Sequence, residues 1–242
     1  MAKGQKDFGL YAPTDTIVGV SDMGELAARL GSPDVFDRRG NVVFIDSFEN
    51  DLIPYTANIS GAGASIKVVT DHARTGSFSC KMVTGSDGVR LARLQKFLAY
   101  PALTKWGFEI GFTFLATMEQ YLLTLIFVNG TSYTSFAIRV DPINDKFQYI
   151  SAAGAWVDIA SGLELYAEHD LFNFMKLVVN LEDKTYARAT LNEQAFSLAD
   201  IPSYQYTDTA GHFLLARVDI VGIAGNNYFS YLDEFIVTQN EP

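Results

Sequence analysis

The sequence predicts an all-β protein built as a sandwich of two antiparallel sheets. Strand-like segments follow one another at short intervals from residue 42 to residue 238. Turns rich in Gly, Asn and Asp separate them, and only residues 22–30 carry apolar side chains at helical spacing. Many short strands with few helices are typical of two packed sheets.

The chain changes character near residue 40. Residues 1–41 contain two short extended segments and too few apolar side chains for a core, whereas the rest of the chain is dense in strand signals. We therefore expect an N-terminal arm at residues 1–41 and a single sandwich domain at residues 42–242. All-β domains commonly have this length.

A short helix is predicted within the arm at residues 22–30. Met23, Leu26 and Leu30 fall on one helical face, and a glycine and a proline follow. Because an isolated helix of this length is marginal in water, its apolar face needs a surface to cover. Together with Tyr11, these residues are the expected contacts of the arm.

Five strands are expected in the first part of the sandwich. They are 42–48, 64–70, 77–83, 89–97 and 106–115. The second and fourth alternate between two sets of side chains, as residues facing opposite sides of a sheet do. The third follows a tight turn that ends in Gly76, and the fifth contains Gly107 and Gly111, which indicate bends or close backbone approach.

Four more strands are expected in the middle of the chain. They are 121–128, 135–140, 146–150 and 156–159. The segment 121–128 is nearly all apolar, which is typical of a strand buried on both faces. Short turns at 141–145 and 153–154 join the others, so these strands should form hairpins.

The chain closes with five predicted strands. They are 174–181, 185–191, 195–198, 218–223 and 228–238. The first two flank the polar turn Glu182-Asp183-Lys184 and make the clearest hairpin in the sequence.

Composition excludes several classes of protein. With 48% hydrophobic residues the chain can build a core, so it is not disordered. A net charge of −10, with no basic cluster beyond Arg38 and Arg39, argues against nucleic-acid binding. The chain lacks an apolar run of about 18 residues and the apolar segment of a signal peptide, so we expect no membrane association. The single cysteine, Cys80, is expected to be a buried thiol.

No catalytic set is recognisable. A glucanase-like Glu-x-Asp-x-x-Glu string is nearest at Glu49-Asn50-Asp51, where the last Glu is missing and Pro54 ends the strand. Glu109 and Asp219 stand singly in strands and are expected to be solvated. The three histidines lack metal-ligand spacing. We therefore expect a protein that is not an enzyme, with a glycoside hydrolase or lyase as the weakest alternative.

Three passages resemble the concanavalin A-like jelly-roll family of lectins, laminin-G domains and carbohydrate-binding modules. They are Asp46-Ser47-Phe48-Glu49 with residues 73–81 after it, the hairpin region 174–192, and Tyr231–Val237 near the end. In such modules a structural calcium often lies where the first and last strands meet. The resemblance implies Glu49, Asp233 and the backbone of Gly76 as its ligands, because Ca²⁺ prefers oxygen ligands; alternatively, both carboxylates are solvated strand ends. No other cofactor is expected.

The same resemblance implies that a surface glycan could be the partner. A carbohydrate-binding module needs aromatic platforms, and the candidates are Trp106, Trp156, Tyr133 and Tyr166. The alternative for these side chains is core packing, since aromatic residues are enriched in strands.

Residues 26–49 are similar to the front end of uncharacterised phage structural proteins of the capsid-decoration kind. This resemblance implies a virion component whose arm contacts a second copy of the chain or another virion protein. We therefore expect a structural protein located in the virion, with a carbohydrate-binding module, extracellular or cytoplasmic, as the alternative.

Overall fold

A computed structural model describes residues 40–115, 118–168, 170–208 and 211–242. Sixteen strands are present in these ranges, and all of their pairings are antiparallel. The predicted helix at 22–30 and the arm contacts lie outside the described residues. Within those residues, no helix has the length and hydropathy required to cross a membrane.

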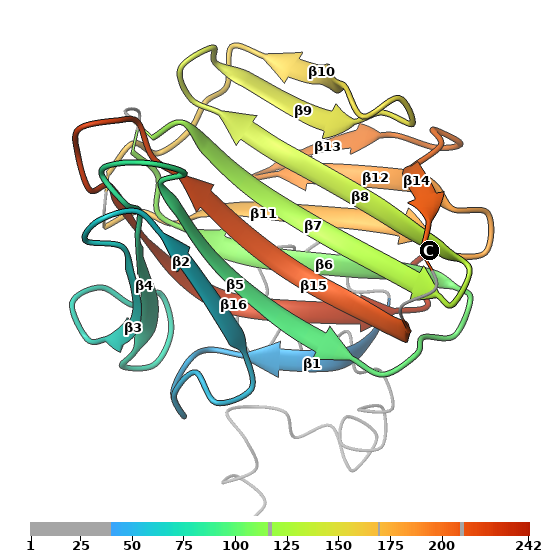
Figure 1. Cartoon of the computed structure of the whole chain (residues 1–242), viewed down its shortest axis with the longest axis horizontal. Coiled ribbons are helices and arrows are strands. Elements are labelled where there is room, and N and C mark those ends of the chain that lie inside the picture. Colours follow the sequence, from blue (N-terminus) through green and yellow to red (C-terminus); the bar gives the residue numbers. More distant parts are fainter. Residues whose placement is uncertain (1–39, 116–117, 169, 209–210) are drawn as a thin grey trace, which may run out of the picture.

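The strands form two sheets that lie one in front of the other (Figure 1). Sheet A runs in the order β13 (Gln194–Ser197), β12 (Thr185–Leu191), β11 (Asn173–Asn180), β6 (Lys105–Phe112), β16 (Phe229–Gln239), β4 (Ser79–Val83) and β3 (Ser65–Val69), and β1 (Asn41–Asp46) also pairs with β16.

Sheet B runs in the order β10 (Trp156–Ser161), β9 (Lys146–Ile150), β8 (Ser132–Asp141), β7 (Gln120–Asn129), β15 (His212–Val221), β5 (Leu91–Leu98) and β2 (Thr56–Ser60), and β14 (Tyr204–Thr207) pairs with β8. The expectation of two antiparallel sheets is therefore confirmed.

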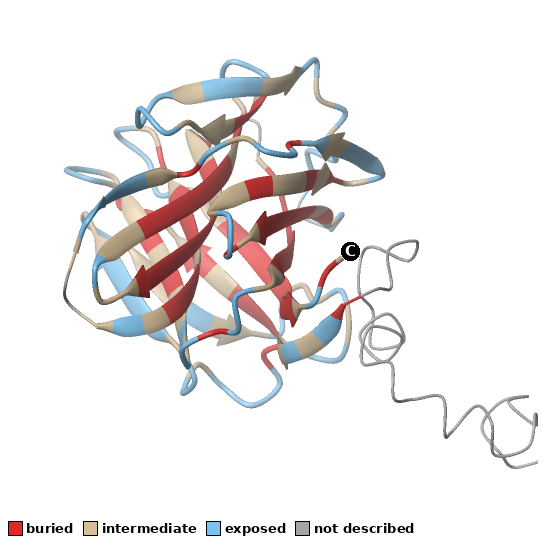
Figure 2. Ribbon diagram, turned by 90° about the vertical axis from the view of Figure 1, so that its right-hand side faces the viewer, coloured by how far each residue is buried: buried red, intermediate tan, exposed pale blue. Residues whose placement is uncertain are grey.

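A single apolar core fills the space between the sheets. Alternate residues of the central strands point inward, such as Phe108 and Ile110 on β6 or Leu123 and Leu125 on β7, and all four are buried. Burial is concentrated in the middle of the strands and falls off towards the loops (Figure 2). Cys80 is buried in this core, as expected.

All fourteen predicted strands are present, and two further strands were not predicted. The unpredicted strands, β2 and β14, are short and mostly polar, and each lies at the edge of a sheet. Edge strands bury little side-chain surface, so their sequences show no clear apolar alternation. Strand β15 also begins six residues earlier than expected, at His212.

The last strand, β16, pairs with two different strands on the same side, one after the other along its length. Its first half pairs with β4 and its second half with β1, and a β-bulge lies at the change of partner. Glu234 lies in this bulge and has a φ of 56°, in the left-handed region. The first and last strands of the domain are therefore neighbours, as the family resemblance implies.

Candidate functional site

Asp233, at the bulge of β16, holds the turn that precedes β4. Its Oδ2 accepts hydrogen bonds from the backbone N–H groups of Arg74 and Thr75 at 2.9 and 3.0 Å, and its Oδ1 accepts one from the N–H of Glu234 at 2.8 Å. Burial raises the pKa of the Asp233 carboxyl, and these N–H groups oppose that shift.

Glu49 holds the other half of the same turn. Its Oε1 accepts hydrogen bonds from the N–H groups of Ser77 and Phe78 at 2.8 and 3.0 Å. Between the two anchors Gly76 has a φ of 65°, and a Cβ at this position would lie 2.2 Å from Glu49 Oε1. The fold thus brings Glu49, Asp233 and Gly76 together, as the family resemblance implies.

This arrangement does not fit a calcium site at these residues. The turn directs N–H groups at both carboxylates, whereas a bound cation requires oxygen ligands that face one point. In the described parts of the chain, no three His, Cys, Asp or Glu side chains gather in a way that would hold a metal ion. The contacts present are those of an anchor for the turn, so this geometry does not support the calcium site that the resemblance implies.

The outer face of sheet B, which points away from the core, carries a different group of side chains. The strand registers place Tyr133 on β8 next to Tyr206 on β14, and their rings stack with centroids 4.4 Å apart and planes 20° apart. Tyr206 is 46% exposed. Burial raises the pKa of the Tyr133 phenol, so it stays protonated at neutral pH.

A small apolar cluster lies beneath these rings on the outer face. Ile126, Val128 and Leu215 are buried there, and Tyr133 and Phe213 pack against them. This cluster explains why β7 is buried on both faces, as the sequence predicts. It also holds the aromatic rings in place.

Charged side chains occupy the same face beside the aromatic ones. Arg93 on β5 donates two hydrogen bonds to its cross-strand partner Asp219 on β15, at 2.7 and 3.1 Å. The Nε of Arg217 lies 3.1 Å from the same carboxylate. Asp219 is only 3% exposed, so the expectation that it is solvated is wrong, because cations on neighbouring positions of the face cover it.

Trp156 lies at the far end of this face, on edge strand β10. The guanidinium of Arg139 stacks 4.3 Å from the Trp156 ring centroid and donates a hydrogen bond of 2.7 Å to Gln148 Oε1. Gln148 in turn donates to Asp158 at 2.6 Å, and Lys146 donates to the same carboxylate at 2.7 Å. Burial lowers the pKa of Arg139 without removing its charge.

Of the four aromatic residues that the sequence singles out, Trp156 and Tyr133 share the outer face of sheet B. Trp106 points inward from β6, is 3% exposed and donates its indole N–H to the Ala102 carbonyl at 2.8 Å. Its ring is therefore enclosed by the core and cannot serve as a platform. Glu109 is also buried, at 2% exposure, instead of solvated, because Lys176 lies 3.5 Å away on the neighbouring strand.

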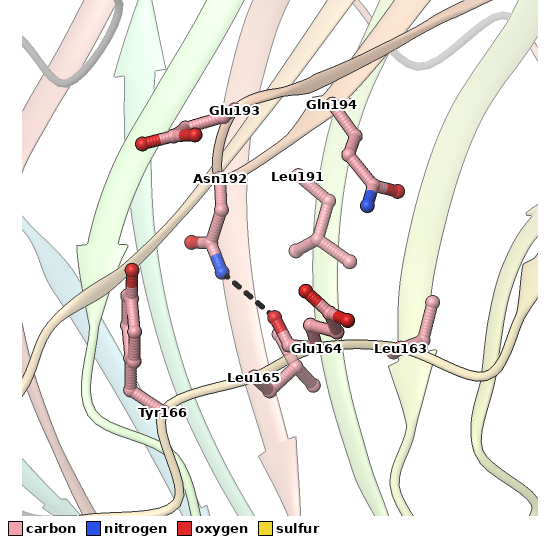
Figure 3. A pocket seen from close by; sticks show the side chains of 8 residues that line it. All are labelled: Leu163, Glu164, Leu165, Tyr166, Leu191, Asn192, Glu193 and Gln194. Atoms are coloured by element: carbon pink, nitrogen blue, oxygen red, sulfur yellow. Dashed lines mark hydrogen bonds between the residues drawn. The ribbon is translucent and has the colours of Figure 1, made fainter.

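Tyr166 lies elsewhere, at a pocket of about 430 Å³ (Figure 3). The pocket is lined by Leu163, Glu164, Leu165, Tyr166, Leu191, Asn192, Glu193 and Gln194. Asn173, which is fully buried, exchanges two hydrogen bonds of 2.9 Å with the Tyr166 backbone and so fixes the loop. The pocket offers one aromatic ring and no cationic side chain among its lining residues, so it is a poorer match to a glycan site than the face of sheet B.

Two residues of this face, Tyr206 and Arg217, were not among the predicted site residues. Tyr206 belongs to the unpredicted strand β14. Arg217 precedes the predicted start of its strand, although its spacing of two from Asp219 would have placed both on one face. Extending the strand back to His212 would have placed Arg217 and Asp219 on the same face of β15.

Comparison with known proteins identifies the fold. No family model matches the chain, and no curated protein matches it in sequence. The solved structure of an endo-β-1,4-glucuronan lyase from the fungus Trichoderma reesei is similar, with a TM-score of 0.58, 9% identity and coverage of 83% of this chain and 96% of the lyase.

Two further structures resemble the chain to a similar degree. The cellulose-induced protein Cip1 has a TM-score of 0.54 and 14% identity, with 81% of this chain and 96% of that chain covered. A carbohydrate esterase from the Shiga toxin-encoding bacteriophage phi24B has a TM-score of 0.53 and 15% identity, with 84% and 100% covered. At these identities the likeness concerns the fold alone, and it establishes a concanavalin A-like jelly-roll sandwich.

Proposed function

We propose that the sandwich binds carbohydrate on the outer face of sheet B and catalyses no reaction there. The observation that carries the proposal is the placement of the stacked Tyr133–Tyr206 pair and Trp156 on one face with Arg139 and Gln148. Aromatic rings pack against the C–H faces of sugar rings, and planar polar side chains bind sugar hydroxyls.

The dimensions of this face suit an extended chain rather than a single sugar. Tyr133 and Arg139 are six residues apart on β8, which corresponds to about 20 Å along the strand. The proteins of similar fold include a glucuronan lyase and a phage carbohydrate esterase, which agrees with a polysaccharide ligand.

The carboxylates on this face favour binding over glycoside hydrolysis. A hydrolase requires a protonated carboxylic acid beside a second carboxylate. Lys146 and Gln148 hold the pKa of Asp158 below its usual range, and Asp219 accepts hydrogen bonds from Arg93. Asp158 is therefore ionised at neutral pH, and both oxygens of Asp219 are engaged by a guanidinium. Release of shortened or unsaturated sugars from a polysaccharide incubated with the protein would contradict a purely binding role.

A glycan array followed by titration of the best ligand tests the proposal. We expect saturable binding that Trp156→Ala and Tyr206→Ala each weaken by about tenfold, because stacking on an aromatic ring contributes roughly 1–1.5 kcal/mol. Tyr166→Ala, at the separate pocket, is the matched control and should bind normally. A flat array, or equal losses in all three variants, would remove the basis for this site.

A second candidate function is a structural role in a phage particle, located in the virion. The resemblance of residues 26–49 to phage structural proteins and the similarity in fold to a phage protein support it. In this role the arm would contact a second copy of the chain or another virion protein. Size measurement of the full chain and of residues 40–242 tests it: we expect an oligomer that the shortened chain no longer forms. An unchanged assembly state would count against the role.

A further inference from the structure

Arg217 stands out among the charged residues on the outer face of sheet B. Its side chain is 19% exposed and lies beside Asp219, yet its buried Nε has no hydrogen-bond partner. Its Nε forms an ion pair with Asp219 Oδ2 at 3.1 Å that lacks the geometry of a hydrogen bond, and the same carboxylate accepts two hydrogen bonds from Arg93. A largely buried guanidinium whose N–H groups are not all hydrogen-bonded keeps donors that a ligand can use.

A second unsatisfied polar group lies directly beside Arg217. Thr124 is its cross-strand partner on β7, and the Thr124 hydroxyl is fully buried without a hydrogen-bond partner. Buried hydroxyls are normally hydrogen-bonded, so two neighbouring groups of this kind on an outer face indicate a place where a ligand supplies the missing acceptors.

The local charge on this part of the face is positive. Arg93 and Arg217 together face one carboxylate, Asp219, which leaves one positive charge in excess on a chain whose net charge is −10. On the Trp156 side the charges balance, because Arg139 and Lys146 lie near two carboxylates, Asp141 and Asp158. Cations therefore outnumber carboxylates immediately around Asp219, whereas the carboxylate of Asp208 acts on the neighbouring Tyr206.

Arg217 also lies close to the aromatic platform. The positive charge of Arg217 opposes the rise that burial causes in the pKa of the Tyr133 phenol, and the Tyr133 ring stacks on Tyr206. A sugar that rests on this pair can place a substituent of its ring over Arg217. The planar fork of a guanidinium matches a carboxylate through two parallel hydrogen bonds.

We propose that this face binds an acidic polysaccharide, with Arg217 and Thr124 binding the carboxylate of a uronic acid unit. The inference rests on the proposed function and names its ligand class. Because Thr124 is fully buried beside Arg217 in the strand register, its hydroxyl reaches the ligand only when the neighbouring side chains move outward. Arg217 is the residue that distinguishes an acidic sugar from the neutral sugar of the same shape, whereas Trp156 and Tyr206 bind both.

The test compares two oligosaccharides of equal length that differ at one carbon of each ring. Calorimetric titration with β-1,4-glucuronan oligosaccharides and with the corresponding neutral β-1,4-glucan oligosaccharides should show at least ~tenfold tighter binding of the acidic chain. A sulfated β-1,4-glucan serves as a third ligand and should bind less well than the glucuronan, because the proposal concerns a carboxylate rather than any anion.

Variants assign the selectivity to Arg217. Arg217→Gln should lose ~tenfold or more in affinity for glucuronan and leave binding of the neutral chain within about twofold. Arg217→Lys keeps the positive charge but loses the planar guanidinium, so its affinity for glucuronan should lie between those of the wild type and Arg217→Gln. Lys67→Gln removes the same charge from an exposed position on sheet A and is the matched control.

Thr124→Val keeps the test informative if the Arg217 variants fail to fold. This change preserves the shape of the side chain and removes the unsatisfied hydroxyl, so we expect unchanged or higher stability with weaker binding of glucuronan. Equal affinity for acidic and neutral chains, or unchanged glucuronan binding in Arg217→Gln, would overturn the inference and leave the proposed function standing. If no glycan of either kind binds, the proposed function itself fails.

Discussion

At the level of single residues, the turn between β3 and β4 depends on Gly76. Its φ of 65° lies in the left-handed region, and a Cβ would lie 2.2 Å from Glu49 Oε1. Both the backbone conformation and the close contact therefore require glycine. The two carboxylates that anchor the turn belong to Glu49 and Asp233. The turn around Gly76 therefore connects the beginning of the domain with its last strand.

We predict that Gly76→Ala lowers the free energy of unfolding by about 2–3 kcal/mol, because it adds a steric clash to a left-handed backbone. Gly88 is the matched control, since it has a φ of 58° and a Cβ added there would meet no atom within 4 Å. Gly88→Ala should cost only about 1 kcal/mol. Urea denaturation of both variants checks this, and equal losses would show that the contact with Glu49 is unimportant.

Glu49 and Asp233 allow a second prediction, about calcium. Because their oxygens already accept N–H groups of the turn, we expect the melting temperature to be the same with calcium and with a chelator. Glu49→Gln should lower it, since the charged acceptor is lost. A ligand of the folded state raises stability by mass action, so a fall in the melting temperature on chelation would establish a calcium site.

At the level of the strands, the contact between β5 and β15 is reinforced by the Arg93–Asp219 pair. Asp219 is buried, and it is the shared partner of two guanidinium groups. Removing one member of such a pair costs more than the pair contributes, because the remaining charges keep their desolvation penalty.

We predict that Asp219→Asn destabilises the protein by about 2–3 kcal/mol, somewhat less than for a fully buried pair because Arg93 is partly exposed. Asp158→Asn is the control. It removes a carboxylate from the same sheet, but its pair with Lys146 is exposed, and exposed pairs contribute little. Thermal unfolding of the two variants should differ clearly; similar melting temperatures would argue that Asp219 is solvated in practice.

At the level of the entire chain, the sandwich contains its own core. Among the described residues, the buried apolar cluster draws on strands of both sheets. Hydrophobic burial is the dominant favourable contribution to folding, and this cluster supplies it between the two sheets.

We therefore predict that a chain of residues 40–242 folds on its own. It should unfold in one cooperative transition and keep the β-sheet circular dichroism of the full chain. A non-cooperative transition would mean that residues before 40 complete the core. The same shortened protein serves for the assembly measurement, so the two outcomes can be read together.

Periodicity in the sequence was enough to predict the strands and the two-sheet architecture. An alternating segment such as 89–97 indicates a strand with one buried face. The continuous apolar run at 121–128 indicates a strand that is buried on both faces. Turn residues then delimit the strands. Strands β2 and β14 were not predicted. An edge strand forms by hydrogen bonding to its neighbour and needs no apolar pattern of its own.

The candidate site depended much more on long-range packing. The amino-acid pattern alone established that aromatic side chains and isolated strand carboxylates were present, and that the domain was an all-β sandwich. It could not tell that Trp106 faces the core while Trp156 faces outward, or that Arg217, Arg93 and Asp219 meet. Those facts depend on which strands are neighbours and in what register, and that is decided by packing between residues far apart in the chain.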